Sequence, residues 1–266
     1  MTVGIVGHPV ILFGNAATLE ISSPIQGDTM TVDDGLKPPK RTVGDIASVV
    51  VKAGLSMVPL VGGPAAELFA AVITPPLEKR REKWMNEIAE GLRDLAARGD
   101  LDIESLSQNP LFLTTVLQAS QAALRNHQEE KLVALRNAVL NAAMPNPLDE
   151  SINMIFLNFI DTCTVWHLKI LDLFDDPARW AERHQRKFPV FSMGGLENIL
   201  ENLFPELSEK EPFYNLIWRD LVSKGLLEGD LHVTMSDHGL RQPRSTEMGK
   251  MFLRFVADPR RPPGGG

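Results

Sequence analysis

The residues of this chain that could carry out chemistry are scattered and form no known motif. Its six histidines are His8, His127, His167, His184, His232 and His238. None stands four residues from another with an acid between them, so the helical zinc-protease pattern is absent. His232 and His238 stand on either side of Asp237 in a predicted loop, but no thiol is near to complete a structural zinc site. We therefore predict no metal site.

Motifs for nucleophilic catalysis and phosphate binding are also missing. The single cysteine, Cys163, falls at an apolar position of a helical pattern, and we interpret it as a core thiol. The glycine pairs at 62–63 and 194–195 lack the Lys-Ser/Thr of a phosphate-binding loop, and there is no Gly-x-Ser-x-Gly. The sequence predicts a protein that is not an enzyme and binds no cofactor.

Composition and charge narrow the class of protein further. The chain has 266 residues, of which 44% are hydrophobic and 23% charged, a balance typical of globular proteins. The formal net charge of −7 argues against nucleic acid as the partner. The first residues lack the basic region of a secretory signal and include Pro9. We therefore predict a cytoplasmic protein.

The elements that must position these residues are predicted to be helices. Apolar residues recur at three- and four-residue spacing, which predicts an all-α fold. Helices are expected over 76–99, 110–124, 127–143 and 149–173, with a short surface helix in 177–188. The helix over 149–173, capped at its start by Asp149, has the most regular apolar stripe, which is typical of the central helix of a bundle. The stripe consists of Ile152, Ile155, Phe156, Phe159, Cys163, Trp166, Ile170 and Leu173.

The C-terminal part follows a different pattern. Two short helices, a strand at 231–235, a polar loop and a final helix predict a winged-helix-like domain. Acidic residues outnumber basic ones in the stretch ELSEKEPFYNLIWRDL, which leads into and includes part of its second predicted helix, so we expect this domain to contact a protein in preference to DNA. The predicted domains are a β-like N-terminal arm and linker (1–42, with Met30 as an alternative start), a helical bundle (43–190), the winged-helix-like domain (191–258) and a flexible tail (259–266).

The most unusual feature is the apolar segment of residues 46–73. It contains only two charges, Lys52 and Glu67, and prolines and glycines between Pro59 and Pro64 interrupt it. The basic stretch LEKRREKW follows soon after. Two interpretations stay open: a helical hairpin packed inside a soluble bundle, or one that is sheltered at rest and reaches the inner membrane when a trigger releases it.

The membrane interpretation assigns roles to particular residues. Apolar side chains would enter lipid, and basic ones would hold the chain at an anionic surface. The residues predicted to insert are Leu55, Met57, Val58, Leu60, Phe69 and Val72. Lys79, Arg80 and Arg81 are predicted anchors, and Trp84 would lie at the membrane–water interface.

Three stretches of the chain together form a family-like pattern: EKLVALRNAVLNAAMPNPLDESINMIFLNFIDTCTVWHLKILDLF and the closing LVSKGLL and STEMGKMFLRFV. In these stretches the chain resembles the Abi-alpha family of bacterial abortive-infection proteins, over roughly residues 43–256. The apolar, glycine-containing leader is similar to those of membrane-disrupting defence effectors. The resemblance implies a non-enzymatic defence or toxin-type effector and carries over no catalytic residue.

Two functions are consistent with these features. The first is a defence effector that acts on the inner membrane, with an oligomer formed on activation. The alternative is a soluble adaptor whose C-terminal domain binds a protein partner or, less favoured by charge, DNA. An enzyme of unrecognised type is a third, weaker reading.

Overall fold

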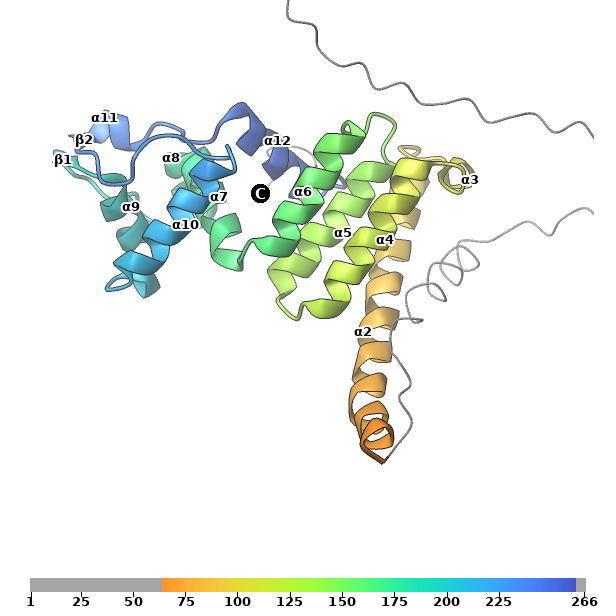
Figure 1. The fold of residues 1–266 in the computed structure, drawn as a ribbon. Helices are drawn as coiled ribbons and strands as arrows, with labels where there is room; N and C mark the ends of the chain where they lie inside the picture. The colour runs from red at the N-terminus through yellow and green to blue at the C-terminus, as the bar shows by residue number, and fades with distance from the viewer. Residues whose placement is uncertain (1–63, 262–266) are drawn as a thin grey trace, which may run out of the picture. The chain divides into compact units, whose positions relative to one another are not determined.

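The computed structural model describes residues 64–261, and their side chains from Val72 onward. These residues lie in one compact unit that consists almost entirely of helices (Figure 1). The all-α prediction is confirmed for this part of the chain, where the sheet has two very short strands. The predicted N-terminal arm, most of the apolar segment and the end of the predicted tail lie outside the described residues.

The elements follow one another along the chain as helices with a few short strands and turns. They are α2 (Pro64–Ala97), α3 (Ile103–Leu106), α4 (Pro110–Arg125), α5 (Glu129–Ala143), α6 (Glu150–Thr162), α7 (Val165–Asp175), α8 (Pro177–Arg183), β1 (Met193–Gly194), α9 (Leu196–Leu203), the 3₁₀ turn η1 (Pro205–Leu207), α10 (Glu211–Ser223), β2 (Met235–Ser236), α11 (Asp237–Leu240) and α12 (Glu247–Val256).

The central helix of the bundle is α5, with α2, α4, α6 and α12 packed around it (Figure 1). Its side chains are buried on several faces, including Leu135, Ala138 and Leu140. Small residues let the neighbours approach closely. At Gly91 of α2 an added Cβ would lie within 3 Å of Leu140 side-chain atoms, so only glycine fits this crossing without a shift.

The prediction of one long central helix over 149–173 is wrong. The chain bends by 118° between α6 and α7, because Cys163 and Thr164 adopt extended backbone conformations. Thr164 then caps α7 together with His167 in a reciprocal capping box. The apolar stripe continues across the bend, so its regular spacing concealed the break.

The start of the first described helix also differs from the prediction. The helix expected from Pro76 begins at Pro64 and contains Pro75 and Pro76 within it. Pro64 takes the first helical position, where a missing N–H costs no hydrogen bond. The proline ring fixes φ near the helical value, so the later pair removes two helix hydrogen bonds without ending the helix here. The last part of the apolar segment and the basic stretch are therefore one helix.

The C-terminal elements pack on the bundle through a continuous hydrophobic core. β1 pairs antiparallel with β2, and a bridge joins Leu227 to Ser245. The strand predicted at 231–235 is present only at Met235. The helix predicted at 177–188 ends at Arg183 and is less superficial than expected, since Trp180 is buried. At the end of the described chain, α12 packs against α5 and α7.

Candidate functional site

Three side chains that could hold a metal or share a proton meet at the bend between α6 and α7. Cys163, His167 and Asp220 each offer one ligand atom, and these atoms lie within 4.8 Å of one another. Asp220 comes from α10, distant in sequence, and it is half-buried, whereas the other two are buried. Sequence reasoning missed this group because nothing near residue 163 indicates which later carboxylate folds against it. We call these three residues, with Thr164 and Lys224, the corner network.

His167 uses both of its ring nitrogens within the corner network. The backbone N–H of Thr164 donates to Nδ1 at 3.0 Å, so Nδ1 is the unprotonated acceptor. Nε2 therefore carries the proton and lies 3.1 Å from Asp220 Oδ2. Burial lowers the pKa of His167, and the carboxylate of Asp220 offsets this only in part. The ring is neutral at pH 7 and has no free nitrogen to accept a proton from Cys163.

The thiol and the carboxylate are equally unsuited to catalysis. Burial raises the pKa of Cys163 to about 11, whereas a nucleophile or metal ligand must be a thiolate. Lys224 Nζ donates to both carboxylate oxygens of Asp220, at 2.7 and 2.8 Å. Although burial alone would raise the pKa of Asp220, these bonds hold it below its ordinary value. Both carboxylate oxygens of Asp220 therefore already bind an ammonium group, with which a metal ion would have to compete.

The corner network is therefore a structural joint between the bend and α10. Within it, Thr164, His167, Asp220 and Lys224 are joined by hydrogen bonds, as buried polar groups in stable cores are. Cys163 is buried as the sequence predicted.

The other acids and histidines noted in the sequence do not assemble into a site. Among the described residues, Asp237 binds Arg241 at 2.8 Å, and His232 Nε2 lies 2.8 Å from Asn215 Oδ1. Asp237 is thus committed to a cation and not to the flanking histidines.

A groove of about 1150 Å³ opens between the start of α5, α7, α8 and α12. Its walls carry charges of both signs that pair with one another, as Lys169 does with Glu130 at 3.4 Å and Arg183 with Asp172 at 3.2 Å. Such a balanced lining selects neither an anionic nor a cationic ligand. The groove therefore indicates no ligand class.

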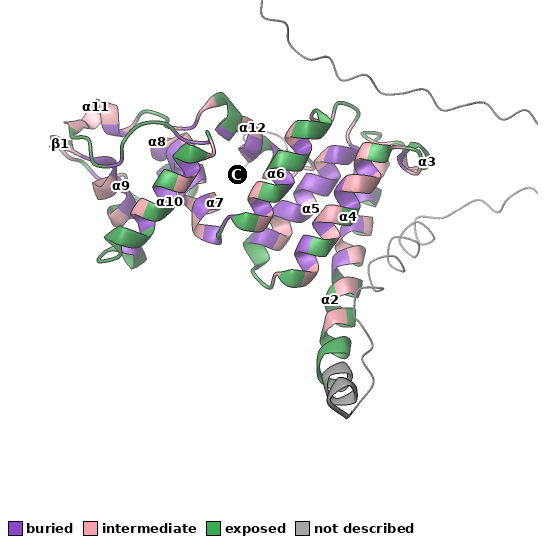
Figure 2. Cartoon of the chain, in the orientation of Figure 1, coloured by how far each residue is buried: buried purple, intermediate pink, exposed green. Residues whose placement is uncertain are grey.

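The first part of α2 is the described feature that matches the sequence-predicted membrane site. Before Trp84, no described side chain of this helix is buried. Its first turns extend beyond the other helices as exposed or undescribed ribbon (Figure 2). We call residues 72–83 the free half of α2 and residues 84–97 its held half.

The structure places the predicted membrane residues in three groups. Leu55, Met57, Val58 and Leu60 lie outside the described residues, as does the side chain of Phe69. Val72 is 59% exposed, Lys79 and Arg80 are exposed, and Arg81 is half-buried. Ile73, which was not singled out, is also exposed, at 36%. The described end of the apolar segment is therefore not sheltered, contrary to prediction.

Trp84 requires a correction. It is only 4% exposed, and its Nε1–H donates to Ser120 Oγ of α4 at 2.9 Å. A side chain held in this way cannot lie at a lipid surface while α2 is packed. Trp84 marks the point where α2 enters the core, and we remove it from the membrane-facing set.

Among the described helices, none alone has the length and apolar character needed to cross a bilayer. Helices α6 and α7 meet those criteria only together, as a bent pair.

Comparisons with known proteins give no match. No family model matches the chain, and no curated protein or solved structure shows significant similarity to it. Function has to be inferred from the residues and their geometry.

Proposed function

We propose that this protein is a non-enzymatic bacterial defence effector, of the abortive-infection or toxin type, that acts on an anionic membrane surface. Contact would be made by the free half of α2 and the apolar segment before it. The observation that carries the proposal is the exposure of Val72 and Ile73 at an unpacked helix end that continues into a basic stretch.

The physical basis is a combination of apolar and electrostatic attraction. Residues 78–83 contain four basic and two acidic side chains. A Lys or Arg near an anionic bilayer contributes about 1 kcal/mol, and apolar side chains that enter the lipid boundary add to this. Neither contribution alone gives stable attachment, but the two lie on adjacent turns of one helix.

The held half of α2 would anchor the free half to the helical bundle. Trp84, Ile88 and Leu92 fix it in the core, so the free half can meet a surface without any core residue being exposed. Release from a sheltered state is not needed for the described residues. We also propose that an oligomer forms on the membrane.

The first test compares two matched charge reversals on α2, Arg80→Glu and Arg93→Glu. Both side chains are exposed, but Arg93 lies on the held half. Reversal at Arg80 removes one attraction to the anionic surface and adds one repulsion. Together these weaken binding by about 2 kcal/mol, which is about 30-fold in membrane affinity. The measurement is co-sedimentation of the full chain with anionic and with zwitterionic vesicles.

We expect the native chain and Arg93→Glu to bind anionic vesicles with the same affinity, and Arg80→Glu to bind them much more weakly. It fails if the native chain does not bind anionic vesicles, or if both variants lose binding equally.

The alternative function is a soluble adaptor, for which the observation is the outer face of α10. Leu216 is 67% exposed there, beside the partly exposed Phe213, while the inner face packs through Trp218. In a winged-helix-like domain this helix would be the recognition helix. Its apolar outer face suits a protein partner better than phosphates.

Two measurements separate these functions. A gel-shift titration over a salt series tests DNA, because phosphate contacts must weaken steeply with salt. Growth arrest on expression in bacteria, relieved by Leu216→Glu but not by Arg80→Glu, would favour the adaptor.

A further inference from the structure

The chain that leaves α12 turns back over α5 and is held there by two asparagines. Asn137 Nδ2 donates to the carbonyl of Val256 at 2.8 Å. Asn141 Nδ2 lies 2.9 Å from the carbonyls of both Phe255 and Ala257. The last carbonyls of a helix have no partner within it, so side chains of α5 satisfy those of α12. The direction of the following residues is thereby fixed.

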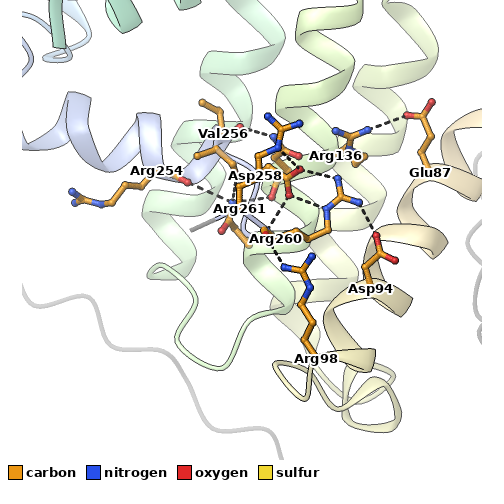
Figure 3. Close-up of polar contacts among 12 residues, drawn as sticks. Glu87, Asp94, Arg98, Arg136, Arg254, Val256, Asp258, Arg260 and Arg261 are labelled. Atoms are coloured by element: carbon orange, nitrogen blue, oxygen red, sulfur yellow. Dashed lines mark hydrogen bonds and ion pairs between the residues drawn. The ribbon is translucent and has the colours of Figure 1, made fainter. Parts of the chain in front are cut away.

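The next residues reach the end of α2 (Figure 3). Arg260 Nη1 bonds Asp94 Oδ2 at 3.1 Å, and its Nε and Nη2 each bond one oxygen of Asp258 at 2.8 Å. In return, Arg98, just beyond α2, donates to the backbone carbonyl of Arg260. Asp258 orients the guanidinium, and a fork held in this way loses little entropy when it binds a second carboxylate.

We infer that residues 257–261 form a clasp that keeps the held half of α2 closed on α5. The need for such a clasp follows from the place of α2 at the edge of the bundle, where it packs mainly on α4 and α5. Its free half adds no buried side chain, and apart from an exposed ion pair of Lys83 with Glu129, burial secures the helix only from Trp84 onward. The clasp acts at the opposite end from the free half and couples the end of the described chain to its first helix.

The clasp has a regulatory consequence that rests on the proposed function. A partner or protease that removes residues 257–261 from α5 would loosen the helix that carries the exposed apolar and basic residues. Trp84 and Ile88 would then gain access to the surface that Val72 already faces. The C-terminal segment would set how readily the rest of α2 follows its free half into lipid.

The experiment is hydrogen exchange of the full chain with Arg260→Ala, and with Asp94→Ala to break the same pair from α2. The control is Arg261→Ala, since Arg261 is 79% exposed and reaches Asp258 only at 4.0 Å. Loss of one partly buried ion pair should speed exchange in residues 88–97 by about three- to tenfold. In the Arg261→Ala control, residues 88–97 should exchange at the native rate. The amides of α4 and α6 should exchange at the native rate in every variant.

Unchanged exchange of residues 88–97 in both Arg260→Ala and Asp94→Ala would overturn the clasp. Equal acceleration in all helices would also overturn it, because it would indicate general destabilisation. Dye release from anionic vesicles is measured separately on the same proteins. Faster exchange without greater dye release would support the clasp and count against its regulatory consequence, whereas greater release without faster exchange would contradict the clasp. Dye release by none of these proteins, the native chain included, would count against the membrane function.

Discussion

At the bend between α6 and α7, one histidine performs two structural tasks. His167 accepts the Thr164 backbone N–H that begins α7, and it donates to Asp220 of α10. A free acceptor nitrogen on the ring would suit catalysis, but here Nδ1 accepts from Thr164 and the Nε2 N–H faces Asp220. The residue types resemble a catalytic triad, yet the direction of each hydrogen bond identifies a joint.

The pKa of His167 makes this joint sensitive to acid. The folded pKa is lowered from 6.5, so below pH 6.5 the unfolded chain binds a proton that the folded chain resists. Stability should therefore fall as pH drops from about 7 to 5.5, by at most about 1.4 kcal/mol per pH unit. Gln at this position completes a Thr-x-x-Gln capping box and can still donate to Asp220. In His167→Gln we expect near-native stability at pH 7.5 and a flatter profile.

Urea unfolding of both proteins at several pH values checks this prediction. His167→Gln removes the titration while keeping the hydrogen bonds, so the comparison isolates the proton. If the free energy of unfolding falls with pH equally steeply in the two proteins, His167 is not the group responsible.

At the scale of elements, α12 is placed by a glycine. A Cβ at Gly249 would lie 2.1 Å from the backbone carbonyl of Leu226, and a backbone atom cannot swing aside as a side chain can. Alanine favours the helix by about 1 kcal/mol, but the clash should outweigh this and destabilise Gly249→Ala by about 1–3 kcal/mol.

Thermal and urea unfolding of Gly249→Ala measure this cost. The neighbouring Met248 is 39% exposed, and Met248→Ala serves as the control, with an expected change within about 0.5 kcal/mol. A Gly249→Ala protein as stable as the native one would show that α12 can shift away from Leu226 without loss.

The helix pattern also shows how far sequence reasoning reaches. Local signals were sufficient where the cap lies beside its helix, so Asn109 and Asp149 begin α4 and α6 as predicted. The break at Thr164 was missed because histidine replaces the usual Glu or Gln of a capping box. Contacts that join distant segments, such as Asp220 with His167 or Arg260 with Asp94, have no local signature, since tertiary packing alone brings them together.

At the scale of the whole molecule, the bundle and the C-terminal elements share one core. Phe252 of α12 packs on Phe156 of α6 with ring centroids 5.2 Å apart, and Phe255 lies 5.6 Å from the same ring. These side chains come from the two domains predicted at 43–190 and 191–258. We therefore expect the two regions to unfold together, although they were predicted as separate domains.

Phe252→Ala tests that expectation. Removing a fully buried aromatic side chain should destabilise the protein by about 3–5 kcal/mol. Because the ring belongs to a shared core, the loss should appear equally in both regions. Hydrogen exchange of α5 and of α10 near the denaturation midpoint should accelerate to the same extent, with one transition by circular dichroism and by tryptophan fluorescence. Exchange that accelerates in α10 while α5 stays protected would show that the regions unfold separately, and the clasp would then join two domains.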